Sequence, residues 1–166
     1  MMRVEEICQK LELLLTRSEG SEEKLERCAD AMEHIFGVRR DEVAIFMLDP
    51  EENAFSFAWP PELRKAGTIP AGAENSLVAI TAKERRGSIN NSFATTPHLF
   101  VFESLGEEKT EPIQKIMSVP MLRGEELRGV IQVSRKGAYG DAALRPFTEP
   151  ELNALEEIAK VVACHI

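Results

Sequence analysis

Two polar residues, Ser118 and Gln132, stand inside segments that are otherwise almost entirely apolar. The lengths and branched side chains of these segments, residues 116–122 and 127–133, predict strands of a sheet that is covered on both faces. A polar side chain on a covered face needs a hydrogen-bond partner, which the backbone, water or a ligand can supply. Ser118 and Gln132 are therefore candidates for a ligand-binding site.

A second group of candidate ligand-binding residues comprises Asn91, Thr95, His98 and Phe100. The surrounding segment, residues 93–102, is rich in hydroxyl and aromatic side chains, and apolar walls with a few polar groups are typical of a binding pocket. The alternative for Asn91, Thr95 and His98 is the ordinary polarity of an exposed loop. His98 has no second ligand at a usable spacing, so the sequence does not predict a haem or metal site there.

Phe57 and Trp59 complete the set of candidate ligand-binding residues. They stand two apart in residues 54–59, a segment that is predicted to be a strand paired with residues 43–48 across a turn. Side chains two apart in a strand point to the same face. We therefore expect both rings on one face, where they could wall a ligand or simply form core.

The sequence offers little for catalysis. The three cysteines, Cys8, Cys28 and Cys164, are scattered and form no CxxC or Cys/His pattern, so small buried side chains are their simplest interpretation. The sequence contains neither a P-loop nor a GxSxG motif. We predict no catalytic residue and no metal site, and the sequence names no cofactor.

Helices are predicted at both ends of the chain. Apolar residues at helical spacing run through residues 4–15 and 25–36, and Gly37 is placed to end the second helix. Thr148 and Glu151 stand three apart, the spacing of a capping box that opens a helix. The apolar stripe of that last helix consists of Leu152, Leu155, Ile158, Ala159 and Val162.

Two further local signals concern the middle of the chain. Ser76 is expected to cap a short helix over residues 77–86 that stops at Gly87. Gly124 can adopt the positive φ of a tight hairpin between the strands that carry Ser118 and Gln132.

The order of these parts resembles the GAF domain, a small-molecule-sensing module of signalling proteins. In the C-terminal half the resemblance rests on Val119-Pro120, Gly124, Gly129-Val130-Ile131, and Phe147-Thr148 followed by Glu149 and Glu151. In the first half it rests on Ile69-Pro70-Ala71-Gly72, Ser76-Leu77-Val78 and Ser88-Ile89-Asn90-Asn91. The resemblance covers residues 21–166, which is nearly the whole chain.

The resemblance implies an α+β, GAF/PAS-like fold, with a central, mainly antiparallel sheet of about six strands and helices on both faces. It implies one domain over residues 21–166, preceded by a helix in residues 1–20 that could act in dimerisation. The implied function is non-catalytic sensing of a small molecule between the sheet and a lid over residues 93–102. The alternative is a structural dimerisation or protein-interaction module whose pocket is filled by its own large side chains, such as Phe57, Trp59, Met117 and Met121.

Departures from better-known branches of the family restrict the ligand. Cyclic-nucleotide-binding members carry a spaced Asn-Lys, Phe, Glu set, which Lys136, Phe147 and Glu151 match, but Arg135 replaces the Asn and could meet a phosphate or carboxylate. Bilin-binding members, and members that reduce methionine sulfoxide, use cysteines near the pocket. This chain has no cysteine in residues 29–163, so the resemblance implies neither chromophore attachment nor that reduction.

The chain of 166 residues has 20 basic and 28 acidic residues, and its formal charge of −8 argues against a nucleic-acid partner. It has no apolar run of the roughly 18 residues that span a membrane, and no hydrophobic signal core at the N-terminus. We therefore expect a cytoplasmic protein with no membrane partner. Because GAF-like proteins often pair through terminal helices, the resemblance implies a homodimer through residues 4–15 and 152–166. A separate output protein would then detect how these helices pack.

Overall fold

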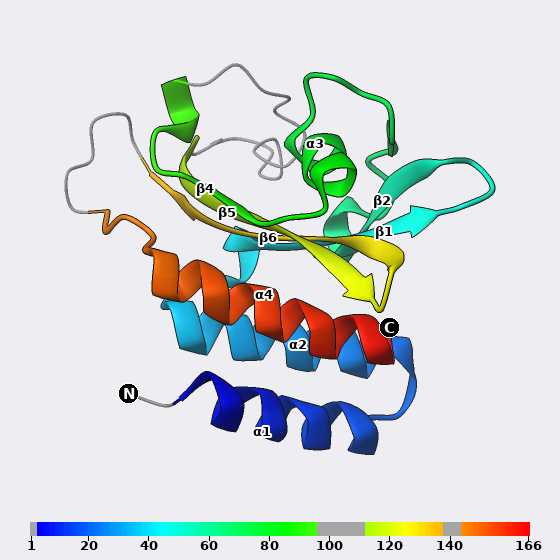
Figure 1. Ribbon diagram of the computed structural model, residues 1–166, viewed down its shortest axis with the longest axis vertical. Coiled ribbons are helices and arrows are strands. Elements are labelled where there is room, and N and C mark those ends of the chain that lie inside the picture. Colours follow the sequence, from blue (N-terminus) through cyan, green and yellow to red (C-terminus); the bar gives the residue numbers. More distant parts are fainter. Residues whose placement is uncertain (1–2, 96–111, 138–143) are drawn as a thin grey trace.

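The computed structural model describes residues 3–95, 112–137 and 144–166, which form a twisted sheet between two layers of helix (Figure 1). In chain order the elements are α1 (Val4–Arg17), α2 (Gly20–Phe36), the 3-10 turn η1 (Arg40–Glu42), β1 (Val43–Asp49), β2 (Ala54–Trp59), η2 (Pro61–Leu63), β3 (Thr68–Pro70), α3 (Leu77–Glu84), β4 (Ser88–Asn90), η3 (Phe93–Thr95), β5 (Ile113–Arg123), β6 (Glu126–Lys136) and α4 (Glu149–His165).

The sheet has six strands in the order β3-β2-β1-β6-β5-β4, and every neighbouring pair is antiparallel. The helices α1, α2 and α4 lie on one side of the sheet, hereafter the helix face, and α3 lies on the other, hereafter the α3 face (Figure 1). This arrangement confirms the predicted α+β fold. β5 and β6 are longer than the predicted strands, and Gly124 turns between them with a φ of 63°.

Local signals set most of the helix boundaries. Gly37 ends α2 in the left-handed conformation, with a φ of 64°, as expected for a residue without a Cβ. The capping box of Thr148 and Glu151 opens α4, with the Thr148 side chain accepting from the Glu151 backbone N–H. The predicted stop of α3 at Gly87 is wrong, because Arg85 takes the left-handed position instead, with a φ of 55°.

Gly87 has a packing role. A Cβ there would lie 3.0 Å from the Val119 side chain and 3.1 Å from those of Leu152 and Glu156. These distances are shorter than ordinary carbon contacts. The glycine therefore lets the chain pass close to β5 and α4.

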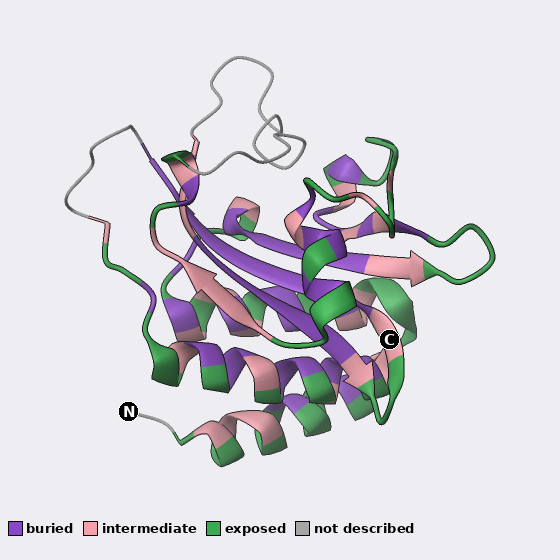
Figure 2. Ribbon diagram, turned by 45° about the horizontal axis from the view of Figure 1, so that its top comes forward, coloured by how far each residue is buried: buried purple, intermediate pink, exposed green. Residues whose placement is uncertain are grey.

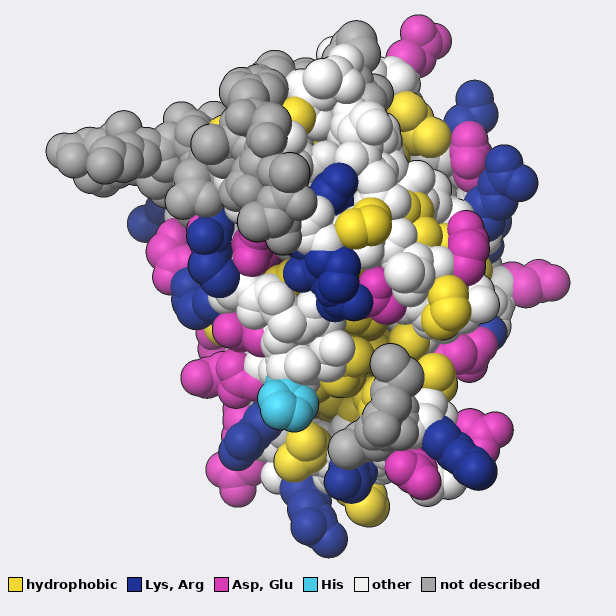
Figure 3. Space-filling model, turned by 90° about the vertical axis from the view of Figure 1, so that its left-hand side faces the viewer, with side chains coloured by type: hydrophobic (Ala, Val, Ile, Leu, Met, Phe, Trp, Pro, Cys, Tyr) yellow, Lys and Arg dark blue, Asp and Glu magenta, His cyan; other side chains and the backbone are white. Residues whose placement is uncertain are grey.

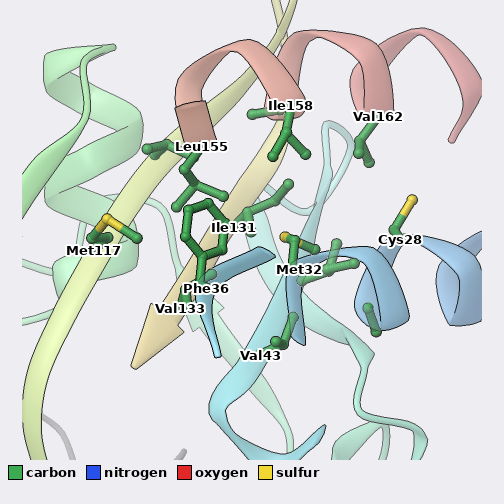
Figure 4. Packing of buried hydrophobic residues seen from close by; sticks show 14 of the residues in the cluster. Cys28, Met32, Phe36, Val43, Met117, Ile131, Val133, Leu155, Ile158 and Val162 are labelled. Carbon is green, nitrogen blue, oxygen red and sulfur yellow. The ribbon is translucent and has the colours of Figure 1, made fainter. Parts of the chain in front are cut away.

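The helix face holds the larger core. Figure 4 shows Phe36 of α2 and Leu155 of α4 meeting Ile131 of β6 in the middle of this layer. α1 belongs to the same core, because its Leu11 and Leu15 are 1% and 0% exposed. The apolar stripe of α4 is likewise buried within the chain. The stripes that were expected to form a dimer surface are thus used largely for intramolecular packing.

Gly129 permits the close approach of β1 and β6 at the centre of the sheet. A Cβ on this residue would lie 1.9 Å from the backbone oxygen of Phe46, well inside the contact distance of any two such atoms. A glycine in a strand often marks such an approach of two backbones. In the part of the chain that the structure describes, none of the helices has both the length and the apolar character needed to cross a membrane.

Candidate functional site

The α3 face carries a row of small and polar side chains across its centre. Ala44 of β1, Gln132 of β6 and Ser118 of β5 lie side by side in the register of the sheet. The Gln132 side-chain N–H donates to the Ser118 hydroxyl at 3.2 Å, and Thr81 of α3 shares a 2.7 Å hydrogen bond with the same hydroxyl. The three polar residues are 0–4% exposed, and they tie α3 to the middle of the sheet.

Larger side chains stand on both sides of this row. Phe46 and Val130 occupy the next row toward the β5–β6 turn, and Ile116 lies on the opposite side of the row. Ala44 and Ser118 have the small side chains of the row, and both are 0% exposed. Figure 2 shows these central strands as buried, with α3 exposing only its outer side. The sequence prediction that Ser118 and Gln132 need partners is consistent with this geometry, which joins them to each other.

Phe57 and Trp59 do not share a face, contrary to the prediction. Phe57 packs in the α3-face cluster, where its ring centroid lies 4.5 Å from that of Phe46, whereas Trp59 packs in the helix-face cluster. The cause is a bulge between Ile45 and Phe46, which shifts the pairing of β1 and β2 by one residue. A one-residue shift reverses the face to which a side chain points. Arg40 covers the Trp59 ring at 4.7 Å.

The side chain of Asn91, which follows β4, forms two hydrogen bonds to the segment before α4 and so acts as a bracket between these two segments. Its side-chain N–H donates to the Phe147 carbonyl at 3.1 Å, and its side-chain oxygen accepts from the Phe147 N–H at 2.9 Å. Lys115 donates to the Asn91 carbonyl at 3.2 Å. The amide of Asn91 thereby satisfies both backbone groups of the residue that precedes the α4 cap. The exposed Thr95 donates to the Ser92 carbonyl at 3.0 Å. His98 and Phe100, with the rest of residues 96–111, lie outside the described residues.

Arg135 holds the edge of the helix face together. Its guanidinium donates to the Phe36 carbonyl at 3.0 Å and the Gly37 carbonyl at 3.4 Å. Both carbonyls lie at the C-terminal end of α2, where carbonyl groups have no partner within the helix. The guanidinium also lies 4.4 Å from the centre of the Phe147 ring and 3.8 Å from the Glu151 carboxylate. Burial, followed by the nearby charge of Arg145, lowers the pKa of Arg135. The phosphate or carboxylate partner that the sequence suggested for Arg135 is thus a carboxylate of the chain itself.

Two buried charged residues, Glu42 at the end of η1 and Lys136 at the end of β6, also form hydrogen bonds within the protein. Glu42 accepts from the backbone N–H of Arg39 and of Lys136. The Lys136 ammonium donates to the Asp41 carbonyl at 2.8 Å. Both residues therefore stabilise the junction of η1 and β6. No local pattern in the sequence indicates the roles of Lys136, because its contacts with Glu42 and Asp41 join residues 94 and 95 positions apart.

The cysteines all lie in the helical layer, away from the α3 face. Cys28 is buried in α2, and burial raises the pKa of its thiol to about 12. Cys8 is half-buried in α1, where burial and then the charge of Glu157 raise its pKa, and Cys164 is exposed near the end of α4. A raised pKa keeps a thiol protonated and unreactive. Within residues 3–95, 112–137 and 144–166, no group of His, Cys, Asp or Glu side chains could hold a metal ion.

Comparison with known proteins identifies the family. Residues 18–166 match the family model described as the GAF domain, so the chain belongs to this family. The match begins after α1. The GAF domain is a signalling and sensing module. No curated protein sequence matches the chain.

Several solved structures share the fold. The GAF domain of a phosphoenolpyruvate-protein phosphotransferase from Coxiella burnetii superposes with a TM-score of 0.74 at 11% identity, over 98% of this chain and 91% of that chain. Free methionine-R-sulfoxide reductase from Neisseria meningitidis, solved with its substrate, gives 0.68 at 15% identity, over 98% and 87%. The GAF domain of a two-component sensor histidine kinase from Bacillus halodurans gives 0.62 at 16% identity, over 90% and 95%. The fold therefore occurs in both regulatory domains and an enzyme.

Proposed function

We propose that this chain is a non-catalytic sensing domain that binds a small molecule on the α3 face of its sheet. The observation that carries the proposal is the polar group of Thr81, Ser118 and Gln132, placed between apolar rows at the centre of that face. Binding sites combine an apolar lining with a few convergent polar groups. Burying polar groups in the middle of an otherwise apolar surface costs free energy that apolar side chains would not.

We propose that ligand binding on the α3 face changes the packing of the helix face through Asn91. Phe93, two residues after Asn91, packs in the α3-face cluster, and Asn91 itself holds the backbone of Phe147. Phe147 in turn lies under Arg135, which contacts the ends of α2 and α4. A ligand that favours one position of this segment would thereby bias the packing of α4, which an output protein could detect.

The placement of the cysteines supports a function without catalysis. The methionine sulfoxide reductases with this fold are enzymes, but the thiols of this chain lie in the helical layer and two of them have raised pKa values. A thiol nucleophile needs the opposite shift. Three free thiols are also typical of a reducing compartment, so we propose a cytoplasmic location.

A structural dimerisation module is the second candidate function. Leu13 and Leu14 of α1 are 55% and 43% exposed, and apolar side chains reach the surface of the helical layer between charged ones (Figure 3). α1 also begins with Glu5 and Glu6 and ends with Arg17, so two antiparallel copies would place opposite charges together. We propose that any homodimer forms through this face of α1.

The arrangement of the large side chains does not favour a filled pocket. Of the four that were expected to fill it, Trp59, Met117 and Met121 belong to the helix-face cluster. Phe57 alone of the four belongs to the α3-face cluster.

Native mass spectrometry of the purified protein, compared with its denatured mass, tests the two functions. A small molecule that leaves on denaturation, or a rise in melting temperature with one class among cyclic nucleotides, amino acids, haem and aromatic acids, supports sensing. A ligand-free dimer that no compound stabilises, and that Leu13→Glu converts to a monomer, would favour the structural module. Leu13→Gln is the matched uncharged variant.

A further inference from the structure

We propose that Thr148, the residue that caps α4, is a phosphorylation site whose phosphate displaces the Glu151 carboxylate from two arginines. The arginines are Arg135 and Arg145. This site lies at the edge of the helix face, so the inference goes beyond the proposed sensing function and does not depend on a ligand at the α3 face. It follows from three observations: the exposed hydroxyl of Thr148, the two cations beside it, and the incomplete hydrogen bonding of Arg135.

The hydroxyl of Thr148 is accessible and lies against the first turn of α4. Thr148 is exposed, and its backbone is extended, with a φ of −113° and a ψ of 162°. Its hydroxyl donates to one oxygen of the Glu151 carboxylate at 3.2 Å and accepts from the Glu151 N–H at 3.4 Å. The exposed hydroxyls of Thr16 and Thr95 donate to backbone carbonyls instead. A phosphoryl group on Thr148 would therefore reach the place where the Glu151 carboxylate now lies.

Two arginines converge on the other oxygen of the same carboxylate. The guanidinium of the exposed Arg145 lies 3.3 Å from it, and that of the buried Arg135 lies 3.8 Å from it. Lys115 is the cross-strand partner of Arg135 on β5, and like charges at such positions repel each other. Burial, and then the charge of Arg145, lowers the pKa of Arg135. The two arginines therefore share one carboxylate, and a phosphate dianion would offset their charge better.

Arg135 has donors that the described residues leave unused. Its side chain is 8% exposed, and it donates hydrogen bonds to the carbonyls of Phe36 and Gly37. Its distance of 3.8 Å from Glu151 is too long for a hydrogen bond, and its Nε has no partner among the described residues. One Glu151 oxygen is already used by the N–H and hydroxyl of Thr148. A phosphate presents three acceptor oxygens, so it can contact both arginines where the carboxylate cannot.

The modification requires a protein kinase and a nucleoside triphosphate. The Thr148 oxygen bonds to the γ-phosphorus, the bond from that phosphorus to the bridging oxygen of the departing diphosphate breaks, and the hydroxyl proton passes to a base of the kinase. The phosphate keeps acceptor oxygens at the N-terminus of α4, where the helix dipole favours negative charge. The Glu151 side chain, which lost its hydroxyl donor, turns to solvent because the two anions repel each other.

Phosphothreonine placed at position 148 of the full chain by semisynthesis tests the contact with the arginines. Phosphothreonine at position 68, an exposed site on β3, is the matched control. We expect the second pKa of the phosphate at position 148, followed by phosphorus NMR, to lie about 0.5–1 pH unit below that at position 68, because nearby cations favour the dianion. We also expect the melting temperature to rise by about 2–4 °C relative to the unmodified chain.

Variants of the phosphorylated chain separate the arginines from the helix dipole. Arg145→Gln removes an exposed cation, and we expect it to abolish about half of the lowering of the phosphate pKa. Lys160→Gln, at an exposed position later in α4, is the matched control and should leave the phosphate pKa unchanged. Arg135→Gln would also remove the contacts with Phe36 and Gly37 at the end of α2, so Arg145→Gln is the cleaner variant.

Mass spectrometry of the chain recovered from the cells that produce it tests whether the modification occurs, and we expect phosphate on Thr148 and none on Thr68. Absence of phosphate from Thr148 in both growing and starved cells would overturn the assignment of the site. Equal phosphate pKa values at positions 148 and 68, or equal effects of Arg145→Gln and Lys160→Gln, would overturn the role of the arginines. These outcomes do not depend on whether the α3 face binds a small molecule.

Discussion

On the side of the sheet that carries α1, α2 and α4, the buried side chains are almost all apolar and pack three helices against the strands. On the side that carries α3, hydroxyl and amide groups lie in the centre of a smaller apolar cluster. The helix face therefore contributes mainly to the stability of the fold. On the α3 face, polar groups replace part of the apolar packing. This difference is the main physical reason to place a binding site on the α3 face.

The largest effect is expected from a cavity on the helix face. Leu155→Ala removes a fully buried side chain of α4, and we expect the free energy of unfolding to fall by about 3 kcal/mol. Denaturant unfolding measures the change. Ile80→Ala, at an exposed position of α3, is the control and should change it by less than about 0.5 kcal/mol. Equal losses in the two variants would contradict the division between a packed and an exposed apolar surface.

The link between the faces should show the next largest effect. Asn91→Ala breaks both hydrogen bonds to the backbone of Phe147, and we expect a loss of about 2 kcal/mol in stability. Amide hydrogen exchange should become faster both near Phe93 and in the first turn of α4, because the bracket joins these segments.

Asn153→Ala, at an exposed position of α4, is the control for the bracket. Faster exchange confined to one of the two segments in Asn91→Ala would show that Asn91 does not couple them.

A smaller effect is expected in the polar row of the α3 face. Thr81→Val keeps the shape of the side chain and removes its hydrogen bond to Ser118, and we expect a loss of about 1 kcal/mol. Thr68→Val, on the exposed part of β3, should be neutral by the same urea-unfolding measurement. If Thr81→Val instead raised the free energy of unfolding, the polar groups of the α3 face would be shown to lower the stability of the fold.

The smallest effect at neutral pH concerns Cys28 on the helix face. Its pKa is raised to about 12 in the folded chain, while an unfolded cysteine titrates near 8.5. Above that lower value the unfolded state releases the proton first, so the stabilising contribution is complete at neutral pH and is lost as the pH rises toward 12.

We expect Cys28 to contribute a fall of about 1.4 kcal/mol per pH unit in this range. The measurement is the difference in slope between the wild type and Cys28→Ala, and Cys164→Ala, at an exposed site, is the control. Identical slopes in all three proteins would show that the Cys28 thiol ionises as readily in the folded chain as in the unfolded one.

Local signals in the sequence predicted the elements and their ends. The capping box at Thr148, the left-handed Gly37 and the turn at Gly124 depend on contacts within a few residues, so they could be recognised without the fold. The order of these elements resembles the GAF domain, and that resemblance implied the α+β class. The same reasoning failed for Arg85 and Gly87, because a neighbouring strand and helix, and not the local sequence, require the small residue at Gly87.

The sequence by itself determined that Ser118 and Gln132 must find partners, because their strands are apolar on both sides. The tertiary structure alone decided which partners these are, through the register of β5 with β6 and the position of Thr81 on α3. It also decided that Trp59 faces the helices and that Asn91 brackets Phe147. A bulge and a contact across fifty-six residues leave no local pattern, since both depend on how distant segments meet.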